Sequence, residues 1–82
     1  MTITLAGQLT QTRARRDQLE ALLRELGAAV WDLEAKQRWG RRYNRGLLER
    51  LREDMRDAEF QLMLASTDAA LLEDATDRRG VR

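Results

Sequence analysis

Cysteine, histidine and proline are all missing from this chain of 82 residues. Without cysteine no disulfide can stabilise the fold, and without cysteine or histidine the common structural zinc sites are excluded. The absence of histidine also removes the most frequent general base of enzymes and the Glu-x-x-His pattern of di-iron helical bundles. The absence of proline favours long uninterrupted helices, because proline breaks the helical hydrogen-bond pattern.

Long apolar runs are missing too, since no stretch approaches the ~18 residues that a membrane-spanning helix needs. Residues 1–5 lack the basic segment followed by an apolar segment that is typical of a secretory signal peptide. The absence of cysteine fits a reducing compartment. We therefore expect a cytoplasmic protein, or one incorporated into a particle assembled in the cytoplasm, without a membrane partner.

The length of the chain limits its core. A chain of 82 residues allows one domain at most. A domain of this size buries only about 60% of the surface that its unfolded chain exposes. Because disulfides and zinc are excluded, oligomerisation is the remaining common support for so small a core. We expect a homo-oligomer or a component of a larger protein assembly.

Apolar residues recur at steps of four and three along two segments, from Leu5 to Leu33 and from Leu48 to Leu72. This spacing is typical of helices that pack against other helices. Arginines, aromatic residues and glycines fill the gap at 38–46. The sequence predicts a single domain with one helix over about 4–38, a basic turn over 39–43, a second helix over about 44–76 and a frayed tail over 77–82.

Two arrangements of these helices are compatible with the spacing. The frame shifts by four residues across the gap, which a continuous rod absorbs as a stutter. Gly40 and Gly46 oppose a rod, since each costs about 1 kcal/mol inside a helix. In an antiparallel pair Leu33 faces Leu48, and the long side chain of Arg16 falls opposite a small alanine. We therefore favour an all-α antiparallel helical hairpin, coiled-coil-like, that assembles into a helical bundle.

Two apolar faces are expected on this hairpin. The predicted core consists of large residues of the seam: Leu19, Leu23, Leu26, Val30, Leu33, Leu51, Met55 and Leu62. A second face on the second helix, outside the seam, is the predicted protein-partner face: Phe60, Met63, Leu64 and Leu71. A helix that is apolar on two sides is normally buried on both. On the first helix small residues recur every seven positions, which fits either close helix approach or simple helix propensity.

Charge is distributed unevenly although the net charge is only +1. Residues 1–35 carry −1, residues 36–52 carry +6 and residues 53–82 carry −4. The turn is therefore a cationic pole, and the far half of the second helix is acidic. Segregation of this kind bears on partners and assembly.

The basic turn is the predicted recognition site, with the residues Arg38, Trp39, Arg41, Arg42, Tyr43 and Arg45. Guanidinium groups bind phosphate bidentately and aromatic rings stack on unpaired bases, so nucleic-acid binding is one interpretation. An acidic protein partner is another. The arginines also complement the dipole at the end of the first helix, and the two aromatic rings could close the open end of the bundle.

Catalysis has no support in the sequence. There is no P-loop and no Gly-x-Gly-x-x-Gly motif, and acidic pairs such as Glu53 with Asp57 are typical of a solvated helix face. We expect no enzymatic activity, no cofactor, no metal site and no small-molecule substrate.

The dipeptide Trp39-Gly40 at the turn of a two-helix chain resembles the Trp-x-Gly turn of the WXG100 secreted proteins. That resemblance implies a helical hairpin and no function beyond it. The spacer residue is missing here. The family's C-terminal Tyr-x-x-x-Asp/Glu signal is missing too, because Tyr43 is followed four residues later by Leu47.

The sequence thus predicts a non-enzymatic structural or interaction protein. It would self-associate or dock on a protein partner through its apolar helix faces, as an assembly component or a small adaptor or regulator. Short helical proteins of phage particles have a similar appearance. The alternatives are a nucleic-acid-binding module that uses the basic turn and, more remotely, a WXG100-like secreted hairpin.

Overall fold

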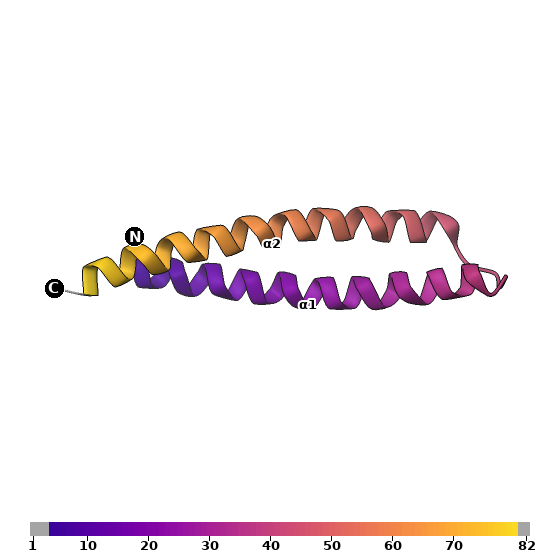
Figure 1. Cartoon of the computed structure of the whole chain (residues 1–82), viewed down its shortest axis with the longest axis horizontal. Coiled ribbons are helices and arrows are strands. Elements are labelled where there is room, and N and C mark those ends of the chain that lie inside the picture. Colours follow the sequence, from indigo (N-terminus) through magenta and orange to yellow (C-terminus); the bar gives the residue numbers. More distant parts are fainter. Residues whose placement is uncertain (1–3, 81–82) are drawn as a thin grey trace.

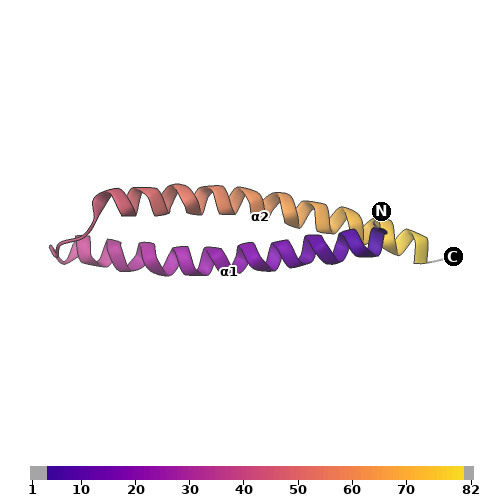
Figure 2. The ribbon, with the colours of Figure 1, turned by 180° about the vertical axis from the view of Figure 1, so that it is seen from behind.

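The computed structural model describes residues 4–80, and for residues 79 and 80 it describes the backbone alone. The chain folds into two long helices, α1 (Leu5–Arg38) and α2 (Arg45–Gly80), that pack side by side in opposite directions (Figure 1). This arrangement confirms the predicted antiparallel helical hairpin and excludes the continuous rod. Seen from behind, both ends of the described chain lie opposite the turn (Figure 2).

Helix α1 begins and ends with recognised capping arrangements. The hydroxyl of Thr4 accepts a hydrogen bond from the backbone N–H of Gly7 at 3.1 Å, as a threonine N-cap does. At the other end, the N–H of Gly40 donates to the carbonyl of Gln37 and the N–H of Arg41 to that of Lys36. These two bonds form a Schellman motif, with Gly40 in the left-handed conformation at φ +66°.

Helix α2 begins directly after Asn44. The side-chain Oδ1 of Asn44 accepts a hydrogen bond from the N–H of Leu47 at 3.0 Å, and its carbonyl accepts one from Leu48 at 3.1 Å. Asparagine is among the strongest N-cap residues. The reversal is therefore specified locally, by a left-handed glycine that ends one helix and an asparagine that starts the next.

The far end of α2 extends beyond the boundary expected from the sequence. The helix continues to Gly80, so 77–80 is helical, although we expected a frayed tail over 77–82. The last two residues of that predicted tail, 81–82, lie outside the described residues. Residues 66–68 do not interrupt the helix either. The hydroxyls of Thr67 and Thr76 donate to the carbonyls of Met63 and Leu72 one turn earlier, so they do not compete with the helix.

The core contains fewer of the large seam residues than the sequence predicts. Of that set only Val30 and Leu33 are buried, and the other six are half-buried. The buried positions are otherwise mostly small residues or residues near the ends of the seam: Leu9, Leu48, Ala58, Ala65 and Ala69. Two helices form a single seam, so a long side chain in it reaches past its partner and leaves its tip exposed. An alanine lies directly against the neighbouring helix.

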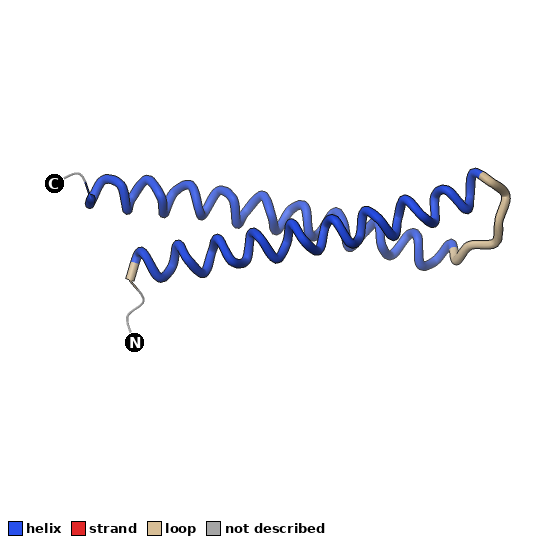
Figure 3. The backbone as a smooth tube through the Cα atoms, turned by 90° about the horizontal axis from the view of Figure 1, so that it is seen from below, coloured by secondary structure: helices blue, strands red, loops and turns tan. Residues whose placement is uncertain are grey.

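The molecule is elongated, with extents of 63 × 25 × 14 Å. The two helices cross at a shallow angle instead of lying strictly parallel (Figure 3). Polar contacts between the helices flank the seam: Arg13 pairs with Glu73 at 2.8 Å and Arg52 with Glu34 at 3.7 Å. Both outer sides of the hairpin remain uncovered.

Candidate interaction surfaces

The turn holds three arginines that make no ion pair within the described part of the chain. Arg38, Arg41 and Arg42 are exposed, whereas Arg45 pairs with Glu49 at 3.6 Å. Lys36, in the last turn of α1, pairs with Asp32 at 3.0 Å. The positive charge of the turn is therefore carried outward chiefly by these three arginines.

The two aromatic residues of the predicted site have different environments. Tyr43 is half-buried and packs against the cluster formed by Val30, Leu33 and Leu48, at the turn end of the seam. Trp39 is 79% exposed. The two rings of the turn therefore differ: Tyr43 packs on the core, and Trp39 faces solvent, where it is accessible to a partner.

Trp39 separates two shallow grooves. One is lined by Trp31, Ala35 and Arg38, and the other by Asp32, Lys36 and Arg41 together with Ala35. Each groove thus pairs the indole with basic side chains. The basic turn consequently combines an accessible aromatic surface with cationic groups on both of its sides.

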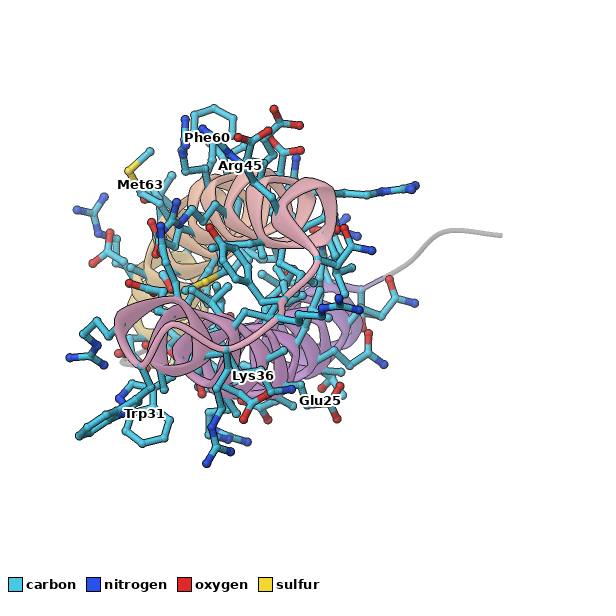
Figure 4. The ribbon with its side chains drawn as sticks, turned by 90° about the vertical axis from the view of Figure 1, so that its right-hand side faces the viewer. Glu25, Trp31, Lys36, Arg45, Phe60 and Met63 are labelled. Atoms are coloured by element: carbon cyan, nitrogen blue, oxygen red, sulfur yellow. The ribbon has the colours of Figure 1, made fainter. Side chains whose placement is uncertain are left out.

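Trp31 is an exposed aromatic residue that the sequence reasoning did not single out. Its side chain is 68% exposed and points away from α2 (Figure 4). A signal was available, because Trp31 directly follows the seam residue Val30 and therefore lies off the seam. It extends the accessible aromatic surface of the turn by two helical turns along α1.

The predicted partner face of α2 is exposed in the isolated hairpin. Phe60 points away from α1 (Figure 4), and it is 55% exposed. The exposed fractions of Met63, Leu64 and Leu71 are 56%, 43% and 64%. We call the surface formed by Phe60, Met63, Leu64 and Leu71 the outer face of α2. It lies opposite the seam, so nothing in the hairpin covers it.

Charged residues border the outer face of α2 at each end. Glu53 and Arg56 precede Phe60, while Asp74 and Arg78 follow Leu71, and all four are exposed. Arg78 and Asp74 pair with each other at 3.2 Å. The outer face is thus an apolar strip with mixed charge at both of its ends.

Acidic side chains do not gather into a metal site within residues 4–80, where no group of three or more of them could hold an ion. Neither described helix has a segment apolar enough, over a sufficient length, to cross a membrane.

Comparisons with known proteins add no functional information, because no family model, curated protein or solved structure matches the chain. The resemblance to the WXG100 proteins therefore remains limited to the hairpin plan and the dipeptide Trp39-Gly40.

Proposed function

We propose that this protein is a non-enzymatic interaction or assembly protein that acts through the outer face of α2. Self-association is the expected form, and docking on a different protein is the other. The observation that carries the proposal is the row of large apolar side chains opposite the seam, each at least 43% exposed. Exposed apolar strips with charged borders are typical of protein–protein contact sites.

The surface area of the isolated hairpin supports the same proposal. The chain exposes 6713 Å². A compact monomer of 9.5 kDa exposes about 5,000 Å². The radius of gyration, 18.2 Å, likewise exceeds the roughly 12 Å expected for a compact domain of this length. A standard interface buries about 800 Å² on each partner, so this hairpin has surface to spare for one.

The role is that of a small assembly component, adaptor or regulator, such as the short helical proteins of phage particles. Nothing in the proposal requires a cofactor, a metal ion or a substrate. Its physical basis is the burial of apolar surface that the hairpin cannot bury by itself.

Sedimentation velocity of the double variant Phe60→Ser plus Leu71→Ser tests the proposal. The wild-type chain should sediment as an associated species at micromolar concentration, and the variant as a monomer, because two large apolar contacts are lost from each copy. Leu47→Ser is the matched control, since Leu47 is also exposed but lies near the turn, off the outer face. Identical behaviour of the wild type and the double variant would contradict self-association through the outer face of α2.

A second candidate function, binding of single-stranded nucleic acid, is favoured by one specific observation. Trp39 is exposed between two grooves that carry Arg38 and Arg41, and neither arginine pairs with a carboxylate within the described chain. An accessible indole stacks on unpaired bases, and arginines beside it neutralise phosphates. Tyr43 is not expected to stack, because its ring packs on the core.

Titration of a fluorescent single-stranded oligonucleotide at several salt concentrations tests this second function. Affinity should fall steeply with salt, and Arg41→Ala plus Arg42→Ala should reduce both the affinity and the salt dependence. Arg15→Ala plus Arg24→Ala removes the same charge far from the turn and should retain more of the binding. Absence of binding at low salt would exclude this function and leave the first untouched.

A further inference from the structure

We propose that the outer face of α2 is occupied by the same face of a second copy of this chain, packed in antiparallel orientation. The inference rests on the proposed function and deepens it, because it names the partner and its register. Four observations support it: the row of residues on the face, the charges at its ends, its position along α2 and the uncovered area.

The outer face of α2 is nearly symmetric about its centre. Three residues of the face, together with the polar Thr67 that lies among them, follow each other at steps of four, three and four residues and so share one side of the helix: Phe60, Leu64, Thr67 and Leu71. The order of steps is the same whether the helix is followed from its N-terminus or from its C-terminus. In an antiparallel pair Phe60 therefore faces Leu71 of the partner copy, and Leu64 faces Thr67 of the partner copy. Met63 flanks the same contact.

The charged ends of the face complement each other in this register. Glu53 lies seven residues before Phe60, and Arg78 lies seven residues after Leu71, so these two residues face each other across the pair. Arg56 lies four residues before Phe60 and Asp74 three residues after Leu71, so these two come within one residue of each other along the axis, about 1.5 Å. By the two-fold symmetry each of these opposite-charge contacts occurs twice.

A parallel pair in register would place like charges, instead of opposite charges, against each other. Every residue of the face would then oppose its own copy, so Glu53, Arg56, Asp74 and Arg78 would each meet a like charge. The arginines of the two turns would also come together at one end. Like charges placed opposite each other disfavour an arrangement, which selects the antiparallel orientation.

The position of the face along α2 favours a large contact. Its centre lies between Leu64 and Thr67, close to the middle of Arg45–Gly80, so two antiparallel copies overlap over most of their length. The exposed aromatic surface of α1, with Trp31 and Trp39, lies at the turn instead. Pairing there would overlap only a few helical turns and would bring the arginines of both turns close together.

The resulting dimer is a layer of four helices in the order α1, α2, α2 of the partner copy and α1 of the partner copy. This order follows because the outer face lies opposite the seam, with Phe60 pointing away from α1 (Figure 4). The basic turns of the two copies lie at opposite ends of the layer. Both copies of Trp39 remain exposed.

Cysteine cross-linking tests the orientation, and the absence of native cysteine keeps it free of background. Two single variants, Glu53→Cys and Arg78→Cys, are treated with a short bismaleimide, separately and after mixing. The antiparallel pair predicts a cross-linked dimer from the mixture alone. Residues 53 and 53, or 78 and 78, of the two copies lie 25 residues apart along the helix axis, about 38 Å, which is beyond the reach of the reagent.

The other outcomes distinguish this inference from the proposed function. If each variant cross-links with itself as readily as in the mixture, the pair is parallel; self-association then stands and the antiparallel register is wrong. If the wild-type chain is monomeric at every concentration and the mixture gives no cross-link, self-association and this inference both fail.

Charge reversal gives a second measurement of the register. Arg56→Asp should weaken dimerisation by roughly 3- to 10-fold, since it places two carboxylates together at both symmetric contacts. Adding Asp74→Arg to the same chain should recover most of the affinity. Arg24→Asp on α1 makes the same change away from the face and should leave the affinity unchanged. Failure of the second substitution to recover affinity would overturn this register.

Discussion

Leu47 and Leu48 are adjacent residues in opposite environments. Leu48 is 2% exposed and packs in the cluster with Val30 and Leu33, whereas Leu47 is 44% exposed. Leu48→Ala should lower the free energy of unfolding by about 2–4 kcal/mol, because it removes buried methyl groups and leaves a cavity. Leu47→Ala should change it by less than about 0.5 kcal/mol. Urea denaturation at one fixed protein concentration measures both, and equal losses would contradict the described packing of the turn end.

Gly40 and Gly27 make a second contrast at the residue scale. Gly40 has φ +66° with open space around its missing Cβ, whereas a Cβ at Gly27 would meet only Met55 Cε, at 4.0 Å. Gly40→Ala should destabilise the hairpin by about 1–2 kcal/mol through backbone strain. Gly27→Ala should stabilise it by about 0.5–1 kcal/mol, because alanine loses less entropy in a helix.

Thermal unfolding followed by circular dichroism gives both changes for these glycine variants. A Gly40→Ala variant as stable as the wild type would mean that the turn does not require the left-handed conformation.

For single residues, the sequence predicts the structural role of some turn positions and not of others. The role of Gly40 in reversing the chain could be anticipated, since glycine ends helices in the left-handed conformation. The different environments of Trp39 and Tyr43 could not. Both are aromatic residues of the same turn, and only the path of the chain after Gly40 directs Tyr43 onto Val30 and Leu48.

Helix α2 carries two apolar faces, and Thr67 is the polar residue at the centre of the outer one. Thr67→Leu should strengthen self-association by roughly 1–3 kcal/mol, since two leucines per dimer would then be buried between the copies. Thr10→Leu is the matched control on α1. Both threonines are exposed, and both donate a hydrogen bond to the carbonyl four residues earlier.

Analytical ultracentrifugation gives the dissociation constants of the wild type and the two threonine variants. Tighter association of Thr67→Leu alone is expected. An equal effect of both substitutions would show that general apolarity, and not the outer face of α2, controls association.

The two helices and their pairing could be predicted because the seam repeats over many turns. Local sequence does not decide whether α2 continues through Ser66, Thr67 and Asp68, since these residues favour caps as readily as they tolerate a helix. Tertiary packing keeps this segment helical: Ala65 and Ala69 are buried against α1 on either side of it. Farther along α2, Glu73 forms an ion pair with Arg13 of α1. The depth of burial of Leu19 and Leu62 also depends on how many helices surround them, which is not encoded in the repeat of one chain.

The whole molecule is a thin hairpin with charge at its turn and an apolar strip along α2. Seven of the residues whose side chains the structure describes are buried, three of them alanine, and they form a small core for two helices of 34 and 36 residues. A second copy on the outer face of α2 would bury the strip and leave the basic turns free at opposite ends. The two proposed surfaces therefore do not compete, and a dimer could present two turns to one extended partner.

The mass of the wild-type chain in solution, measured by light scattering over a range of concentrations, tests the central proposal most directly. A chain of 9.5 kDa that pairs through α2 should approach a mass of roughly 19 kDa as its concentration rises into the micromolar range. A mass of 9.5 kDa at every concentration would contradict self-association through the outer face of α2.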